Sequence, residues 1–327
     1  SQTHFTNQSQ TRYRGFCPYT WNVDGPPSIR QVGFAIKGQK MKSQRIAPHL
    51  FLLPFFLMFA VFWIYPILYS FYVSLTQWDV FHAPQFIGLK NYVQLFSDPE
   101  FHTAMANTFM AAVVYIAVMV SLAIVLGLLL GLAQIRFKSF FRAAFFLPVT
   151  MSLVVVAIVF GMIFSNDFGL LNVLLSSLGL PTFNWLGDPK LALWSIVALR
   201  VWRAAGYYAI FILAGLQNIP EELYEAARLD GASEQQIIRK ITLPLLKPMV
   251  LYVIIISSIW AFQLFDEPWV LTRGGPVRST LTMMMYLYSY SFKYYQFGYG
   301  AAASTVLTAI ILLFAFLNLK IFRTSEV

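Results

Sequence analysis

The sequence has few charged residues and almost no cysteine. Only 11% of its 327 residues are Asp, Glu, Lys or Arg, and 58% are hydrophobic, whereas soluble domains carry roughly 25% charged residues. The single cysteine, Cys17, excludes an internal disulfide and a cysteine-based metal site. The four histidines (His4, His49, His82 and His102) are far apart and match no metal-ligand spacing. We therefore expect a membrane protein without a metal site.

Other missing features narrow the function. The sequence contains no Gly-x-x-x-x-Gly-Lys-Ser/Thr loop, so it does not bind ATP through a Walker site. Its long apolar runs hold almost no acidic residues, so proton-driven or sodium-driven transport would have no carboxylate relay. Potential catalytic residues do not cluster, which argues against a membrane enzyme. The net charge of +9 is spread beside particular apolar runs, which does not favour nucleic acid as a partner.

The apolar residues form continuous runs long enough to cross a bilayer, which takes about 20 residues of helix. A barrel is excluded because its strands would alternate apolar and polar residues. We predict an all-α integral membrane protein with six transmembrane helices, at about residues 49–78, 104–133, 142–164, 191–216, 248–270 and 299–322. Gly127 and Gly131 form a Gly-x-x-x-Gly, which predicts a close helix–helix contact in the second span.

Basic residues give the expected orientation. They precede the first span, occupy the loops after the second and fourth spans, and follow the sixth, whereas the remaining loops are acidic or mixed. Because positive loops stay in the cytoplasm, we expect both termini and loop 217–247 to be cytoplasmic.

The first forty residues have a different composition from the rest. They are polar, contain Gly and Pro, and lack the apolar core of a secretory signal. Residues 41–45 resemble a natural start just before the first span. We therefore expect residues 1–40 to be a disordered or non-native leader, and residues 41–327 to form the membrane domain.

Loop 217–247 is polar and has helical features. Glu221 and Glu222 follow Pro220, as in the first turn of a helix, where the dipole favours negative charge. Leu223 and the adjacent alanines 226–227 form a small apolar face on that helix. An amphipathic helix lying on the membrane surface would also fit this composition.

A second helix is expected after a reversal in this loop. Gly231 permits the turn, and Ser233 with Gln236 forms a capping box. We predict that this helix ends before Pro244. Two short helices hinged at a glycine would form a docking element for a soluble partner.

The complete pattern of this loop resembles that of ABC importer permeases. Glu225-Ala226-Ala227, three residues, Gly231, nine residues, and Ile241-Thr242-Leu243-Pro244 fill every fixed position of the family's loop. The resemblance implies a coupling helix that seats in a cleft of an ATPase subunit. The residues that it assigns to this coupling are Glu221, Glu222, Glu225, Ala226, Ala227, Asp230, Gly231, Ile241, Leu243 and Pro244.

Three further stretches are similar to the carbohydrate branch of that family, the maltose/glycerol-3-phosphate type. They are Phe86–Tyr92, Leu213–Pro220, and Leu271–Pro276, which reads Leu-Thr-Arg-Gly-Gly-Pro. The last is typical of the first of the two paired permeases. The resemblance implies a type I importer permease fold in a prokaryotic inner membrane. It also implies a second, homologous permease, two ATPase subunits that use ATP and Mg²⁺, and an extracytoplasmic solute-binding protein. This chain would bind no cofactor; membrane lipid would surround it.

Aromatic and polar residues near the end of the fifth span are candidates for the solute path, because sugar rings have apolar faces and hydroxyl edges. We propose Trp260, Gln263, Phe265 and Asp266, with Tyr207 and Arg203 from the fourth span. Other roles are open: Trp260 and Trp269 would suit an interfacial belt, and Gln263 and Asp266 would suit a helix cap. We expect the side chains of Arg200 and Arg203 to extend toward the outer interface.

These features predict a permease subunit that is not itself an enzyme. It would move a sugar or oligosaccharide inward by alternating access, with ATP hydrolysed by a separate chain. The same machinery could instead carry a polyol, glycerol phosphate or another small solute. A channel would leave loop 217–247 unexplained.

Overall fold

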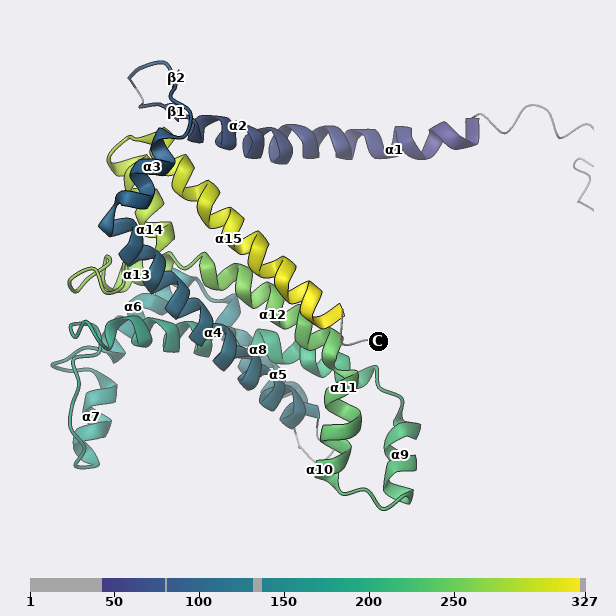
Figure 1. The fold of residues 1–327 in the computed structure, drawn as a ribbon. Coiled ribbons are helices and arrows are strands. Elements are labelled where there is room, and N and C mark those ends of the chain that lie inside the picture. The colour runs from purple at the N-terminus through teal and green to yellow at the C-terminus, as the bar shows by residue number, and fades with distance from the viewer. Residues whose placement is uncertain (1–42, 80, 132–136, 324–327) are drawn as a thin grey trace, which may run out of the picture. The chain divides into compact units, whose positions relative to one another are not determined.

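The computed structural model describes residues 43–79, 81–131 and 137–323 (Figure 1). The leader expected at residues 1–40 lies outside this range. The described chain forms two units, the first ending at Ile64 and the second beginning at Tyr65. The first unit contains α1 (Ser43–Phe59) and the π-helical turn η1 (Ala60–Ile64), along which Phe55, Phe59 and Trp63 form a row of stacked rings. The second unit contains all later elements.

The second unit is helical apart from one short ladder. The strands β1 (Thr76–Gln77) and β2 (Gln85–Phe86) are antiparallel, with Thr76 opposite Phe86. The longer helices are α2 (Tyr65–Ser74), α3 (Lys90–Ser97), α4 (Pro99–Gly131), α5 (Lys138–Thr150), α6 (Leu153–Ile163), α7 (Leu170–Ser177), α8 (Ala192–Gln217), α9 (Glu221–Leu229), α12 (Lys247–Phe262) and α15 (Phe297–Arg323). The shorter helical segments are α10 (Glu234–Ile237), η2 (Ile238–Thr242), α11 (Leu243–Leu245), α13 (Asp266–Leu271), α14 (Met283–Tyr288) and η3 (Ser289–Lys293).

Five helical stretches of the described chain are long and apolar enough to cross a membrane, and a sixth span exists if the bent pair α5 and α6 is one span. The prediction of six spans therefore agrees with the structure in number. The predicted third and fifth spans are not straight helices, however. Both are broken, and the two breaks lie beside α8.

The break in the third span follows a proline. Pro148 lies in the last turn of α5, and Met151 and Ser152 are extended before α6 begins. The axes of the two helices differ by 98°. Because a proline removes the donor to the carbonyl four residues earlier, Pro148 weakens the last turns of α5, just before the chain leaves the helix.

The break in the fifth span precedes another proline. Pro268 lies in the first turn of α13 and cannot donate to the carbonyl of Leu264, four residues earlier. That carbonyl instead accepts a hydrogen bond from the Thr282 hydroxyl at 2.6 Å. Residues 263–265 are therefore non-helical, and the span is divided into α12 and α13.

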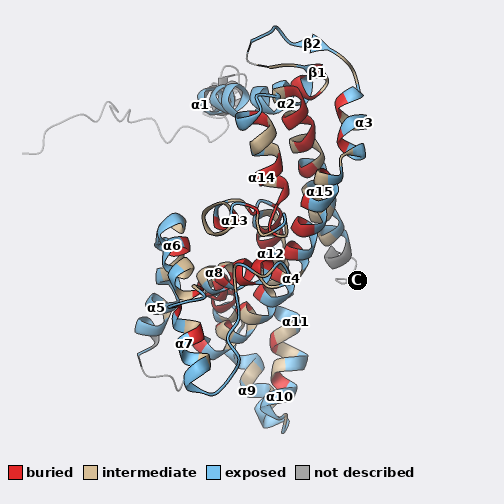
Figure 2. Ribbon diagram, turned by 90° about the vertical axis from the view of Figure 1, so that its left-hand side faces the viewer, coloured by how far each residue is buried: buried red, intermediate tan, exposed pale blue. Residues whose placement is uncertain are grey.

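Helix α8 is the centre of the packing, and Figure 2 shows its buried residues beside those of α4 and α12. Gly127 of α4 permits a close approach to α8, because a Cβ atom there would lie 2.6 Å from Ile212. The predicted glycine contact is thus present. On another face of α8, a Cβ on Gly206 would overlap the carbonyl of Phe145. Gly206 therefore lets α5 lie against α8.

Candidate functional site

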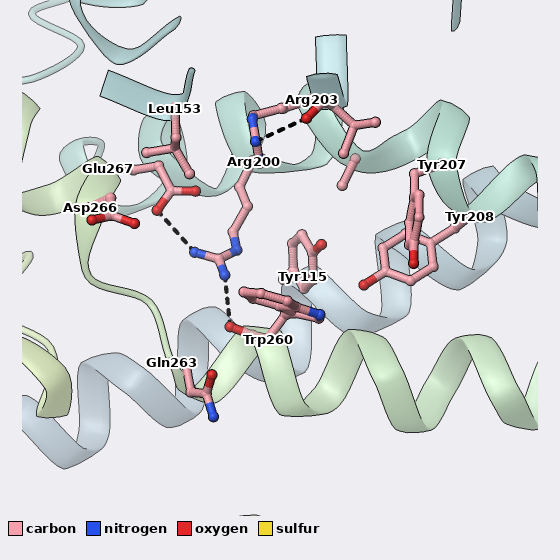
Figure 3. A pocket seen from close by; sticks show the side chains of 12 residues that line it. Tyr115, Leu153, Arg200, Arg203, Tyr207, Tyr208, Trp260, Gln263, Asp266 and Glu267 are labelled. Carbon is pink, nitrogen blue, oxygen red and sulfur yellow. Dashed lines mark hydrogen bonds and ion pairs between the residues drawn. The ribbon is translucent and has the colours of Figure 1, made fainter. Parts of the chain in front are cut away.

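A cavity of about 490 Å³ lies where the two breaks meet α8 (Figure 3). Its walls come from α4, from both sides of the third-span break, from α8, and from both sides of the fifth-span break. The lining residues are Tyr115, Val149, Leu153, Arg200, Arg203, Ala204, Tyr207, Tyr208, Trp260, Gln263, Asp266 and Glu267.

Arg200 connects α8 with the fifth-span break. Its Nη1 donates to Glu267 Oε2 at 2.9 Å, and its Nη2 donates to the Trp260 carbonyl at 2.7 Å. The guanidinium also lies 5.5 Å from the centre of the Tyr115 ring. The side chains of Arg200 and Glu267 are only 11% and 1% exposed. The expectation that Arg200 extends toward the outer interface is therefore wrong, because a buried carboxylate holds it inside the protein.

Arg203 lies three residues further along α8 and connects it with the third-span break. Its Nη2 donates to the carbonyls of Val149 and Met151, at 3.2 and 3.4 Å. These carbonyls lie at the end of α5, where the helix stops and leaves them without helical donors. Arg203 thus also points toward a neighbouring backbone and not along a path to the interface.

The cavity is lined by charged residues of both signs, which balance in formal charge. Arg200 and Arg203 oppose Asp266 and Glu267. Tyrosine hydroxyls and the amide of Gln263 add uncharged hydrogen-bonding groups, and Trp260, which is 56% exposed as a residue, adds an aromatic ring. A site with an accessible aromatic face and several uncharged donors and acceptors can bind a molecule rich in hydroxyl groups.

The cavity brings together five of the six residues that the sequence suggested for a solute path: Tyr207, Arg203, Trp260, Gln263 and Asp266. Phe265 is the exception. It does not line the cavity, since its ring stacks on Trp269 at 5.4 Å and packs against Tyr288.

Nothing in the sequence singles out Tyr115 or the third-span residues Val149 and Leu153. Glu267 and Tyr208, each next to a selected residue in the sequence, are weaker candidates that the structure also places in the cavity. Two signals in the sequence were available: Glu267 is an acid inside an apolar run, and Pro148 is a proline inside another. Neither signal, however, indicates which residues lie beside Glu267 or Pro148 in the folded protein.

Loop 217–247 has the two-helix form that the sequence predicted. Helix α9 begins after Pro220 with Glu221 and Glu222 in its first turn. It ends at Leu229, and the chain turns at Gly231, whose φ of +79° is the left-handed conformation that favours glycine. The Ala232 amide donates back to the Ala227 carbonyl at 2.9 Å and closes the helix end. In Figure 1, α9 and α10 project away from the strands and α14.

The second half of this loop starts with the predicted capping box. Ser233 Oγ accepts from the Gln236 amide, and Gln236 Oε1 accepts from the Ser233 amide at 2.7 Å. The prediction that this helix ends before Pro244 is wrong, because the chain stays helical through η2 and α11. The proline lies in the first turn of α11, where its missing N–H costs little.

Contacts between the two halves hold the loop in one arrangement. Arg228 pairs with Glu234 at 3.3 Å across the turn, and the Thr242 hydroxyl donates to Tyr224 at 3.4 Å. Ile237 is buried, whereas Glu221, Glu222, Glu225 and Ala226 are exposed. One side of the loop is therefore packed against the rest of the chain, and the other side of α9 is exposed.

A carboxylate outside the cavity has an unusual environment. Asp98 Oδ2 accepts hydrogen bonds from Tyr286 at 2.5 Å and from Tyr290 and Tyr299 at 3.3 Å each. Burial opposes the charge of Asp98, but these hydroxyls and the Glu100 amide outweigh it and lower the pKa of the carboxyl. Burial and the bond to Asp98 raise the pKa of Tyr286. This cluster fastens the start of α4 to the segment between α13 and α15.

Comparison with known proteins gives consistent matches. The model of the family "Binding-protein-dependent transport system inner membrane component" matches residues 123–324. The probable ABC transporter permease protein YurN of Bacillus subtilis is 39% identical over 290 residues, covering 88% of this chain and 99% of YurN. The arabinooligosaccharide transport system permease AraP of the same organism is 38% identical over 281 residues, covering 85% of this chain and 89% of AraP.

A solved structure shows the same fold. A chain of the bacterial alginate ABC transporter, crystallised with an alginate pentasaccharide-bound periplasmic protein, superposes with a TM-score of 0.74. The match covers 84% of this chain and 93% of that chain at 23% identity.

Proposed function

Because this chain belongs to the ABC transporter permeases of binding-protein-dependent carbohydrate uptake systems, we propose that it forms half of a pathway that moves a neutral sugar or oligosaccharide inward. As a permease subunit, it is an integral, multi-pass inner-membrane protein and not an enzyme. Its partners would be a second, homologous permease, two ATPase subunits that bind ATP and Mg²⁺, and an extracytoplasmic solute-binding protein.

The coupling role of loop 217–247 rests on its geometry. An exposed helix with an acidic first turn and two small residues can enter a groove on another protein. Its other side is fixed to the membrane domain through α10, η2 and α11. A rigid loop of this kind transmits motion, because a displacement of α9 moves η2 and α12 with it. The ATPase would bind the exposed side, including Glu221, Glu222, Glu225, Ala226 and Asp230.

The remaining residues assigned to coupling would act through the shape of the loop. Ala227 accepts the bond that closes α9, and Gly231 forms the turn. Ile241, Leu243 and Pro244 join the loop to α12. With both termini and this loop in the cytoplasm, the opposite loops would face the binding protein.

The cavity at the two breaks would be the solute site. A neutral glycan would stack on Trp260 and hydrogen-bond to Gln263 and the tyrosines, with Asp266 as a further acceptor. The balanced charge is the observation that favours a neutral solute over a phosphate ester. Arg200 is already paired with Glu267, and Arg203 Nη2 donates to backbone carbonyls, so a phosphate would have to compete with these contacts.

The test uses the complete transporter in liposomes, with its binding protein outside and ATP inside. ATP hydrolysis and uptake are measured with neutral oligosaccharides, polyols, uronates and glycerol phosphate. We expect stimulation by a neutral oligosaccharide. Stimulation by glycerol phosphate or a uronate alone would contradict the proposed neutral site. Stimulation by a polyol alone would show that the solute is a polyol and not a sugar.

A further inference from the structure

The two arginines of α8 contact the two broken spans in the same manner. A helix end leaves carbonyls without donors. Within a membrane, such a break persists only where other protein groups supply those donors. Arg203 supplies one at the end of α5, and Arg200 adds a second donor to the Trp260 carbonyl at the end of α12, which also accepts from the Gln263 amide at 3.1 Å. Because residues three apart share a face of a helix, one face of α8 serves both breaks.

Arg200 also reaches across its break. One nitrogen of its guanidinium binds the Trp260 carbonyl in the last turn of α12, and another binds Glu267 in the first turn of α13. The planar guanidinium presents several donors in a fixed geometry, which the single ammonium of lysine does not. Arg200 therefore fixes the relation of α12 to α13 as well as their position against α8.

Each of these contacts leaves a buried polar atom without a partner among the described residues. One is Glu267 Oε1 and the other is Arg203 Nε. A buried group of this kind carries a free-energy cost, so its neighbours favour any rearrangement that supplies a partner. Each break is thus held by a contact that still has unused hydrogen-bonding capacity.

We propose that Arg200 and Arg203 are positioning residues that each hold one helix break, so that the cavity forms only while both contacts are in place. This inference rests on the proposed function, because it assigns a role within the same cavity. In this role the arginines act on the solute through the backbone of α5 and α12. They do not serve as direct ligands of its hydroxyl groups.

The single cysteine makes a direct test possible. In the complete transporter carrying Cys17→Ser, one reporter is introduced at a time at a buried position next to a break: Ala261→Cys in the last turn of α12 or Val156→Cys in the first turn of α6. The rate of reaction with a membrane-impermeant maleimide is measured with and without ATP. Arg200→Gln and Arg203→Gln are then added separately, and each is compared with its own reporter parent.

The expected result is selective. Arg200→Gln should raise the rate at the buried Ala261→Cys reporter by about tenfold or more, since a hydrogen bond from a charged group is lost, and leave the Val156→Cys reporter unchanged. Arg203→Gln should do the reverse. Arg200→Lys and Arg203→Lys should give intermediate rates, because lysine keeps the positive charge but lacks the fixed donor geometry of the guanidinium. Each lysine variant serves in place of a Gln variant that fails to assemble.

Two outcomes would overturn the assignment. One is that neither reporter responds, or that both respond equally to each substitution. The other is that a substitution raises only the KM for the solute while both labelling rates stay unchanged, which would make the arginine a direct ligand. Labelling does not require transport. A transporter that moves none of the solutes would thus refute the proposed function without deciding this inference, which the labelling pattern decides separately.

Discussion

At the scale of single residues, the pair of Arg200 and Glu267 gives the strongest prediction. Glu267→Gln leaves the charge of Arg200 buried without a counter-ion, and breaking a buried pair in this way costs about 3–5 kcal/mol. The Tm of the purified transporter should fall clearly. Asp266→Asn is the matched control: Asp266 is exposed, so its neutralisation should change stability by about 0.5 kcal/mol or less. Equal shifts for the two variants would refute a special role for the buried pair.

Asp98 gives a residue-scale prediction about pH. Its pKa is lower in the folded protein than in the unfolded chain. The charged carboxylate therefore contributes stability above its unfolded pKa of about 4, and this contribution is lost as the pH falls through the folded pKa. The Tm difference between wild type and Asp98→Asn should be constant from pH 6 to 8 and shrink below about pH 4.

Tyr286→Phe supplies the control for that pH profile. It removes the 2.5 Å hydrogen bond but keeps the ring packed in place, so the pKa of Asp98 should rise toward its ordinary value. The loss of Tm on acidification should therefore begin at a higher pH than in the wild type. A pH profile identical to that of the wild type would show that the tyrosine hydroxyl does not stabilise the carboxylate.

At the scale of elements, the turn between α9 and α10 can be tested through Gly231. No atom lies within 4 Å of a Cβ built there, so a larger residue meets no clash. The backbone is left-handed, however, which costs a β-branched residue about 1–2 kcal/mol. Gly231→Val should reorient α9 and reduce solute-stimulated ATP hydrolysis, while Ala232→Val, one residue further on, should reduce it much less. Similar losses in both variants would point to bulk in this loop and not to its backbone.

The same scale shows what the sequence could predict. The spans and the capping box depend on composition and on spacing within a few residues, and they agree with the structure. The breaks also had local signals in Pro148 and Pro268, but the length of the apolar runs favoured straight helices. The helical continuation through Pro244 was missed because a proline is compatible both with the end of a helix and with its first turn.

The contacts of the cavity could not be predicted in the same way. Arg200 and Glu267 are 67 residues apart, and Arg203 and Val149 are 54 apart. Nothing in a single sequence indicates which break each arginine contacts. The incorrect prediction that Arg200 extends toward the interface followed from considering a long cationic side chain without its partner.

At the scale of the whole molecule, loop 217–247 and the cavity lie at opposite ends of α12. The loop leads directly into α12, and α12 ends at the break that forms one wall of the cavity. A movement of α9 driven by an ATPase would therefore reach the Trp260 and Gln263 side of the cavity through one continuous helix. This connection is the central claim of the mechanism, and it requires that an ATPase bind α9.

The most direct test of that claim is purification of the tagged chain from its native membranes in mild detergent, with mass spectrometry of the co-eluting chains. Wild type is compared with Ala226→Arg, on the exposed side of α9, and with Ser177→Arg, which adds the same charge to exposed α7. A Walker-type ATPase and a second permease should accompany wild type and Ser177→Arg. Ala226→Arg should keep the permease and lose at least about nine-tenths of the ATPase, because an unpaired charge in a buried interface costs several kcal/mol. An ATPase that is absent from the wild type, or that Ala226→Arg leaves unchanged, would contradict this account.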